Sequence, residues 1–384
     1  MNFIVKVTTQ CNFHCDYCSE GNQELQFLSL ELFKKLVDEI PEIVKANKEV
    51  EILWHGGEPL LWGLKRLDAA MNYAEKKLNG FHYHFSMQSN GYLIDDAAIE
   101  ILKRHHVRVG VSLDGYPENH DKVRRTKDGK GTWDMVWNNV QRLKRENLSG
   151  GILMVYRGEE DVQKVFDFLS ETEIPCKINP LLPFGRAAEL EDQSHQVYES
   201  YVDFLEKLYT LSAKSEKSLI IEPLEKIMDA LLQGDGIREC SYSGMCGKDI
   251  LCLYADGNIG FCGRDSETKD FIYGNLREQS LSDLYKAGLA EGLRERNQYL
   301  QEHGCSSCDV FQYCHGGCPY EALHATGSLL QKFPYCSSRK RLLHFLKSEG
   351  ILLLKQRLLR DKRKIRKQLS IRRKLQEELS HARE

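Results

Sequence analysis

Cysteine placement is the feature that constrains this chain most. The 384 residues include 13 cysteines, of which Cys11, Cys15 and Cys18 stand at the front and nine lie between residues 240 and 336. After Met1 the chain shows no charged, apolar and small-residue succession typical of a signal peptide, so we expect a cytoplasmic protein with reduced thiols. Grouped, reduced cysteines indicate metal binding rather than disulfides. The sequence therefore predicts two separate metal-binding regions.

Composition and charge narrow the class of protein further. With 41% apolar and 28% charged residues, the chain can bury a core, and its length predicts about two to three domains. No apolar run is long enough to span a bilayer, so we expect no membrane span. The net charge of −3 hides an asymmetry, because residues 339–384 hold 16 Lys and Arg against 5 Asp and Glu. A basic tail thus follows an acidic body.

The first half of the chain alternates between β-branched runs and helical apolar spacing. The expected strands are Phe3–Thr8, Val50–Leu53, Phe81–Met87, Val107–Leu113, Gly151–Val155 and Cys176–Leu181. The expected helices are Ser29–Ala46, Leu67–Leu78, Asp95–His105, Thr132–Glu146, Val162–Ser170 and Ser194–Leu211. Such alternation is typical of parallel strands covered by helices. Six units predict an α/β fold with a partial (β/α)6 TIM-like barrel, about three-quarters of a full one.

The second half follows a different pattern. Residues Leu219–Leu232 have helical spacing, and Asp256-Gly257 predicts a hairpin turn between Leu251–Ala255 and Ile259–Cys262. Residues 339–384 should form a helix with an imperfect leucine stripe. We therefore expect a barrel over 1–215, a helical linker over 216–239, a small Cys-rich α+β domain over 240–340, and a basic amphipathic C-terminal helix over 341–384.

The front cysteines have the spacing Cys11-x3-Cys15-x2-Cys18 on a loop after the first strand. Three soft ligands on one loop can hold a corner of an iron–sulfur cubane and leave its fourth iron open. The alternative is zinc, which needs a fourth ligand nearby, and His14 is the residue inside the motif that could supply it.

With the aromatic Tyr17 before its third cysteine, this loop resembles that of the radical S-adenosylmethionine (SAM) superfamily. Family-like segments also stand at three later strand ends, at Gly56-Gly57-Glu58-Pro59, Gln88-Ser89-Asn90-Gly91 and Ser112-Leu113-Asp114-Gly115. The carboxyl ends of barrel strands are where such folds build active sites, and glycines there should let backbone donors approach a ligand. The resemblance implies a [4Fe–4S] cluster that cleaves SAM to a 5′-deoxyadenosyl radical. The cofactor-binding residues that it implies are Gly56, Gly57, Glu58, Pro59, Gln88, Asn90, Ser112, Asp114 and Arg124.

The rear cysteines resemble the SPASM domain of peptide-modifying radical enzymes. The seven that carry this resemblance are Cys246, Cys262, Cys305, Cys308, Cys314, Cys318 and Cys336, and Cys240 supplies an eighth. The resemblance implies two auxiliary [4Fe–4S] clusters, one on Cys240, Cys246, Cys262 and Cys318, the other on Cys305, Cys308, Cys314 and Cys336. Without Cys240 as a ligand, the first would keep an open iron. Two zinc-ribbon-like sites are the alternative. Cys176 and Cys252 remain, and we expect them to be buried apolar residues.

Auxiliary clusters that accept an electron indicate a net oxidation, so we expect a maturase that installs a C–C or thioether crosslink in a ribosomally made precursor peptide. The alternative is formylglycine formation, as in anaerobic sulfatase maturases, which this chain also resembles. In those enzymes an Asp follows the hairpin cysteine and acts as a base, whereas here Gly263 follows Cys262. Asp265 is the nearest replacement, and Asp265, Arg264 and Tyr254 are the candidate catalytic residues. A distant alternative is RNA modification.

The partners implied are a precursor peptide and an external one-electron reductant of flavodoxin or ferredoxin type. The cluster loop begins at Cys11, which leaves no room for an N-terminal leader-recognition domain, so we expect a leader to be read by another surface or by a separate binding protein. The basic run from Arg360 to Lys367 could bind an acidic leader, an anionic membrane surface or, less favoured, nucleic acid. Alternatively, the tail is a solvated helix packed on the body through its leucines.

Overall fold

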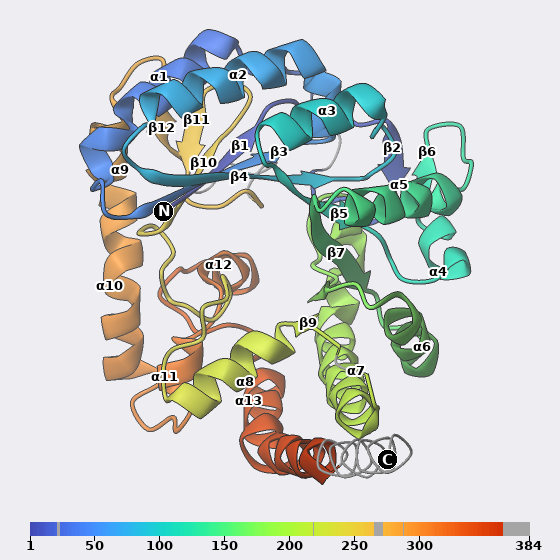
Figure 1. Cartoon of the computed structure of the whole chain (residues 1–384). Coiled ribbons are helices and arrows are strands. Elements are labelled where there is room, and N and C mark those ends of the chain that lie inside the picture. The colour runs from blue at the N-terminus through green and yellow to red at the C-terminus, as the bar shows by residue number, and fades with distance from the viewer. Residues whose placement is uncertain (21–23, 218, 265–271, 287, 364–384) are drawn as a thin grey trace, which may run out of the picture.

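A single twisted sheet organises the molecule in a computed structural model that describes residues 1–20, 24–217, 219–264, 272–286 and 288–363 (Figure 1). Its strand order is β12-β11-β10-β1-β3-β4-β5-β7-β8-β9. The strands of this sheet are β1 (Asn2–Lys6), β3 (Glu49–His55), β4 (His82–Ser89), β5 (Arg108–Ser112), β7 (Ser149–Tyr156), β8 (Cys176–Pro180), β9 (Ile221–Glu222), β10 (Ile250–Leu253), β11 (Asn258–Gly260) and β12 (Ile272–Asn275). A separate two-stranded sheet joins β2 (Phe13–Cys15) to β6 (Arg124–Thr126).

The predicted partial barrel is confirmed. Strands β1, β3, β4, β5, β7 and β8 pair in parallel in that order. Residues alternate between buried and partly exposed along β3, as expected for a strand with one face against helices and one toward the barrel interior. On the helix side, the Trp54 ring lies 5.0 Å from that of Phe33 and 6.1 Å from that of Trp62. These aromatic contacts fix the covering helices to the sheet.

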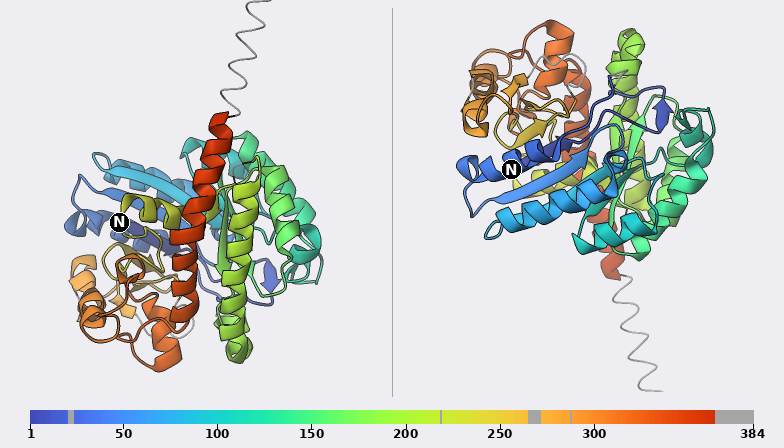
Figure 2. Two further views of the ribbon diagram at one scale, coloured as in Figure 1. Left: turned by 90° about the horizontal axis from the view of Figure 1, so that it is seen from below. Right: turned by 90° about the horizontal axis from the view of Figure 1, so that it is seen from above.

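Helices lie both outside the curved sheet and on its opposite side (Figures 1 and 2). They are α1 (Leu30–Ile43), α2 (Leu64–Lys77), α3 (Asp96–Arg104), α4 (Pro117–Asp121), α5 (Trp133–Arg145), α6 (Val162–Thr172), α7 (Ser194–Lys214), α8 (Leu224–Gln233), α9 (Leu281–Lys286), α10 (Gly288–His303), α11 (Phe311–Cys314), α12 (Pro319–Thr326) and α13 (Cys336–Phe345), with 3₁₀ segments η1 (Pro59–Trp62) and η2 (Gly185–Gln193) and a π-helical turn η3 (Leu346–Gly350). Side-chain caps set several starts: Ser29 accepts from the Leu32 amide at 3.2 Å and Asp95 from the Ala98 amide at 2.8 Å.

Two segments differ from the sequence prediction. The expected hairpin exists as β10 and β11, but β10 also pairs in parallel with β1, with Phe3 opposite Leu251, so the hairpin extends the barrel sheet. The expected helix Leu219–Leu232 begins only at Leu224, because residues 221–222 form β9 and Pro223 lacks the amide that a helix interior needs. Its C-terminal end at Gly234 is left-handed, which glycine adopts without strain.

The first part of the predicted basic helix packs against the body of the protein. Helix α13, η3 and the helical residues 351–363 run along α7 (Figures 1 and 2). The Tyr209 hydroxyl donates to the Gly350 carbonyl at 3.1 Å, and Arg360 donates to the carbonyls of Lys214 at 2.7 Å and Ser215 at 2.6 Å, which belong to the end of α7. Arg360 therefore helps to hold this helix against the end of α7. The part of the basic run beyond residue 363 lies outside the described residues. Leu358 of the expected apolar stripe is 51% exposed.

Among the described residues, no helix is both long and apolar enough to cross a membrane.

Candidate active site

The three front cysteines lie together on the loop that follows β1. Strand β2 within this loop pairs with β6, and the Asn90 side-chain amide is 3.8 Å from the Cys11 sulfur. Burial, with a further contribution from the nearby thiol of Cys18, raises the pKa of the Cys11 thiol to about 11 and that of Cys15 to about 12. His14 points to solvent. The loop therefore presents three neighbouring sulfurs without the histidine that the zinc alternative requires.

Glu58 ties two of the predicted cofactor segments together. Its Oε1 accepts from the Ser89 hydroxyl at 2.9 Å and the Leu60 amide at 3.2 Å, while Oε2 accepts from the Asn90 amide at 2.8 Å. The side chain is fully buried, and burial raises its pKa to about 7 despite these hydrogen bonds. Glu58 therefore locks the ends of β3 and β4 to each other.

The glycines before Glu58 lie against the segment that leads into the cysteine loop. The amide of Gly56 donates to His55 Nδ1, that of Gly57 to the Thr8 carbonyl and that of Glu58 to the Gln10 carbonyl, each at 2.8 Å. A Cβ at Gly57 would lie 2.3 Å from the Gln10 oxygen, so only glycine permits this approach.

Asp114 is the centre of a buried ion network behind the loop. Its Oδ2 accepts from Arg124 Nε at 2.9 Å and from the Tyr17 hydroxyl, and Oδ1 accepts from the Val155 amide at 3.0 Å. Burial alone would raise the pKa of Asp114, but Arg124, His120 and these hydrogen bonds outweigh burial and hold it below its usual value. Two of the predicted cofactor residues, Asp114 and Arg124, are thus engaged with each other.

The other two predicted polar residues at these strand ends also contact each other. Gln88 Nε2 donates to Ser112 Oγ at 3.0 Å across β4 and β5. Pro59 begins η1, where its missing amide is not needed.

Of the histidines on the barrel, His105 bridges Glu75 at 2.8 Å and Asp68 at 2.9 Å on the outer helices, and His120 accepts from the Asp114 amide at 3.2 Å. Both histidines have structural partners.

The rear cysteines fall into two electrostatically linked groups. Burial raises the pKa of Cys246, which the nearby thiols of Cys240, Cys318 and Cys262 raise further. Burial also raises the pKa of Cys305, with further contributions from Cys314, Cys336 and Cys308. These groups have the same members as the two ligand sets implied by the resemblance. Cys176 and Cys252 lie apart, 1% and 0% exposed in β8 and β10.

Each rear group supplies four thiols, the ligand number of a [4Fe–4S] cluster and also of a tetrahedral zinc site. Within the described part of the chain, no three His, Cys, Asp or Glu side chains gather closely enough to hold a single metal ion. Zinc needs all of its sulfur ligands at about 2.3 Å from one point, whereas cubane thiolates bind separate irons.

Two of the three candidate catalytic residues lie beside the first rear group. The Tyr254 hydroxyl donates to the Cys262 carbonyl. Arg264 donates through one terminal nitrogen to Glu321 at 3.2 Å. Burial lowers the pKa of its guanidinium, but the nearby Glu321 and the thiols of Cys318, Cys240 and Cys262 outweigh burial and raise that pKa above its usual value. Asp265 lies outside the described residues.

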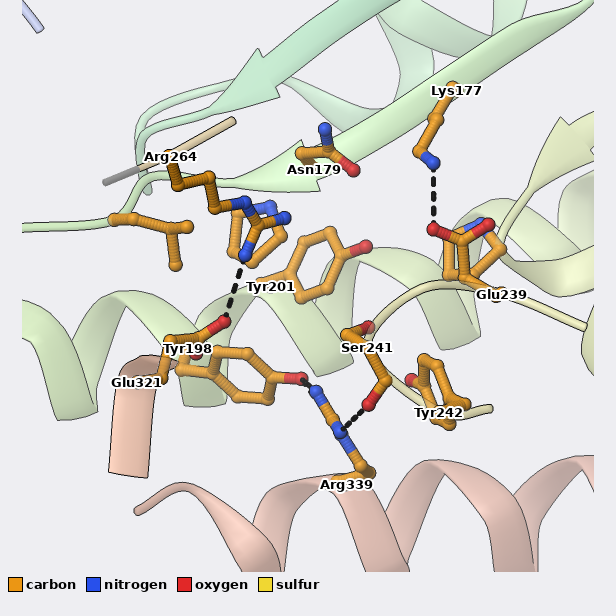
Figure 3. Close-up of a pocket in the computed structure, with 13 residues that line it drawn as sticks. Lys177, Asn179, Tyr198, Tyr201, Glu239, Ser241, Tyr242, Arg264, Glu321 and Arg339 are labelled. Carbon is orange, nitrogen blue, oxygen red and sulfur yellow. Dashed lines mark hydrogen bonds and ion pairs between the residues drawn. The ribbon is translucent and has the colours of Figure 1, made fainter. Parts of the chain in front are cut away.

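A cavity of about 500 Å³ opens between the front loop and the Cys-rich region. Its walls include Ser19 beside Cys18, Phe184 and His195 after β8, and Arg264. The walls further include Tyr320, Glu321 and His324 of α12, and Tyr335 beside Cys336. The Phe184 ring lies 4.8 Å from that of Tyr320. A smaller inner cavity of about 30 Å³ shares Arg264 and Glu321 with it (Figure 3).

Apart from Arg264, these cavity residues were not identified from the sequence. Two features of the sequence could have indicated them: the α12 segment begins directly after Cys318, and Tyr335 directly precedes Cys336. The inner cavity is closed by Arg339, which donates to the Ser241 carbonyl at 2.7 Å and to the Tyr198 hydroxyl at 3.2 Å (Figure 3). Its guanidinium carbon also lies 3.7 Å from the centre of the Phe333 ring. Arg339 therefore joins the Cys240 loop, α7 and α13.

A partial barrel with a thiol loop at the carboxyl ends of its strands defines a cofactor-dependent α/β enzyme. The sequence pattern of the radical SAM superfamily matches residues 5–169. The cysteine-type anaerobic sulfatase-maturating enzyme of Clostridium novyi is 24% identical over 83% of this chain and 87% of its own length, and the serine-type enzyme of Klebsiella pneumoniae is 24% identical over 83% and 81%.

Solved structures show the same fold. The chain superposes on anSMEcpe with bound AdoMet with a TM-score of 0.79 at 20% identity, covering 92% of this chain and 99% of that one. For Streptococcus suis SuiB bound to the precursor peptide SuiA, the TM-score is 0.64 at 16% identity, with 87% and 75% covered. This chain therefore carries a radical SAM domain over residues 5–169. A radical SAM domain implies SAM and a [4Fe–4S] cluster as cofactors.

Proposed function

We propose that this radical SAM enzyme oxidatively matures a peptide or a peptide segment of a protein. The observation that carries the proposal is the cavity of about 500 Å³ between Ser19, next to a front cysteine, and Arg264, next to a rear one. Its volume lies within the range of about 300–1,000 Å³ typical of ligand sites. Sulfatase-maturating relatives and the peptide-bound structural neighbours support this substrate class.

The front cysteines would hold the radical SAM cluster, and the two rear groups would each hold one auxiliary [4Fe–4S] cluster. When bound, SAM and the front cluster supply a 5′-deoxyadenosyl radical that removes a substrate hydrogen atom. The residues around them orient and shield this chemistry. Glu58 and the Asp114 network fix the loops, and the aromatic walls of the cavity exclude water from the reacting side chain.

The modification we favour is an oxidative crosslink in a ribosomally made precursor peptide. Its support is Gly263, because the base found after the hairpin cysteine of sulfatase maturases is missing here. A Cβ at position 263 would face Ile4 at 3.4 Å and Lys6 at 3.6 Å. Lys6 is itself buried and paired with Glu20 at 2.6 Å. A buried ion pair therefore lies beside the place where a carboxylate would emerge.

Formylglycine formation is the second candidate. The sulfatase-maturating relatives match along 83% of this chain or more, which favours it. For either reaction we also propose an external one-electron donor of flavodoxin or ferredoxin type and, for a leader-bearing peptide, a separate leader-binding protein.

The two candidates leave different products. The test uses anaerobically reconstituted enzyme, SAM and a reductant with two substrates: any short peptide encoded beside the gene, and a Cys- or Ser-containing sulfatase peptide. A crosslink removes two hydrogen atoms from the first peptide without creating a carbonyl. Formylglycine creates a hydrazide-reactive aldehyde in the second and would refute the crosslink. Failure of both peptides to increase 5′-deoxyadenosine above the peptide-free rate would count against both candidates.

A further inference from the structure

Arg264 presents unused hydrogen-bond donors inside the protein. A guanidinium carries five N–H groups in a planar fork. Of these, one nitrogen donates to Glu321 at 3.2 Å, and the fork makes no other hydrogen bond within the described residues. The side chain is 31% exposed although it lines both the large and the small cavity. The exposed part of the fork therefore opens into cavity space.

The rest of the large cavity also favours a negatively charged ligand. His195 and His324 line it, and the Nε2 atom of His324 is buried with no hydrogen-bond partner in the described chain. Imidazole nitrogens can donate, and they become cationic when protonated. Glu321 is the one carboxylate among the lining residues that the structure describes, and its Oε1 is already paired with Arg264. Among the described side chains of this wall, Arg264 and the two histidines thus face a single carboxylate.

From this geometry we propose that the cavity is a carboxylate-recognition site, anchored by Arg264, for an acidic side chain of the substrate peptide. The inference rests on the proposed function, because it names the substrate class of the same cavity. A carboxylate matches the planar fork in a bidentate way that an ammonium or hydroxyl group cannot reproduce. The aromatic rings of Phe184, Tyr320 and Tyr335 would pack on the methylene groups of the acidic side chain.

Glu321 provides a second test of the proposal, because it contacts the same guanidinium. Its second oxygen, Oε2, is buried and unpaired, so its charge competes with a substrate carboxylate for the same guanidinium. Removing that charge while keeping the amide oxygen for Arg264 should strengthen carboxylate binding. A residue that merely stabilised the fold would have the opposite effect when altered.

The test measures binding to the reconstituted full chain without reductant, so it is independent of turnover. The probes are N-acetyl-glutamate amide, its glutamine counterpart and its lysine counterpart, titrated by ligand-observed NMR. We expect the glutamate probe to bind most tightly. Arg264→Gln should weaken it at least tenfold, as expected for loss of charge-assisted hydrogen bonds, and Arg264→Lys should fall between. Glu321→Gln should tighten it several-fold. Arg145→Gln, on the exposed face of α5, is the control.

Equal binding of the glutamate and glutamine probes, no saturable binding, or an unchanged affinity in Arg264→Gln would overturn the inference. Iron content and thermal unfolding of each variant show whether it is folded. If Arg264→Gln loses iron, the rise expected for Glu321→Gln decides the matter alone. A failed maturation assay leaves these affinities unaffected, so the proposed function and the carboxylate site can fail separately.

Discussion

Replacing Asp114 by asparagine tests whether this carboxylate is a structural anchor or a cofactor contact. The side chain is fully buried, and both of its oxygens are used inside the protein. Asparagine keeps the shape but removes the charge that compensates Arg124, which is itself 7% exposed. Arg124 and Asp114 form an ion pair with an N–O distance of 2.9 Å, and Arg157 lies 3.6 Å from the same carboxylate. The variant thus leaves buried positive charge uncompensated.

The expected effect is large. Removing one partner of a buried ion pair lowers the free energy of unfolding by about 3–5 kcal/mol. At about 2–4 °C per kcal/mol, the value for domains of 150–250 residues, Tm should fall by about 6–20 °C. Tyr17→Phe removes one hydrogen bond to the same carboxylate, a loss of about 1.5–3 kcal/mol, and should give a smaller decrease.

The assay is anaerobic thermal unfolding followed by circular dichroism, with SAM affinity measured by calorimetry below Tm. Asp128→Asn is the matched control, because Asp128 forms its 2.8 Å ion pair with Lys130 on an exposed turn, where such pairs contribute little. A Tm decrease no larger than that of the control, together with weakened SAM binding, would refute the structural role and make Asp114 a cofactor contact.

Three further changes test the loop supports and the inner cavity. Burial holds the pKa of Glu58 at about 7, so the free energy of unfolding of wild type should fall by about 3 kcal/mol as pH rises from about 4.5 to about 7. Glu58→Gln lacks this titrating group and should not show this fall. The difference in unfolding free energy between wild type and the variant should therefore narrow by about 3 kcal/mol across this pH range. Gly57→Ala places a Cβ 2.3 Å from the Gln10 oxygen and should reduce SAM binding at least tenfold by calorimetry, whereas Gly304→Ala, with only an ordinary 3.8 Å contact, should not. Arg339→Met leaves a buried carbonyl and hydroxyl unpaired and should reduce unfolding free energy by about 2–5 kcal/mol; an unchanged Tm would contradict its bridging role.

The barrel could be predicted because its signals are local. Each parallel strand is a short apolar run followed by an amphipathic helix, and the pairing of β1 through β8 follows from that alternation. Pairing between β1 and β10 could not be predicted, since it joins residues about 250 positions apart and the hairpin pattern is satisfied without it. The small β2–β6 sheet was missed for the same reason, because its three-residue strands carry no periodic signal.

The site was predictable to the extent that its chemistry shows in sequence spacing. The resemblance to the SPASM domain implied which rear thiols would share a cluster, but hydrogen-bond directions did not follow from residue type. The amide of Gly57, for example, donates to Thr8 and not outward. The cavity wall depends on contacts such as Phe184 with Tyr320, which only tertiary folding brings together. Its aromatic residues look like ordinary core residues in the sequence.

Iron and sulfide content of the anaerobically reconstituted protein tests the central claim most directly. Wild type should hold about twelve irons, and a variant with Cys11, Cys15 and Cys18 replaced by alanine should hold about eight, as expected for three [4Fe–4S] clusters of which one is on the front loop. About four irons in wild type together with stoichiometric zinc would contradict the claim, because the rear thiols would then be zinc sites and could not accept an electron from the substrate.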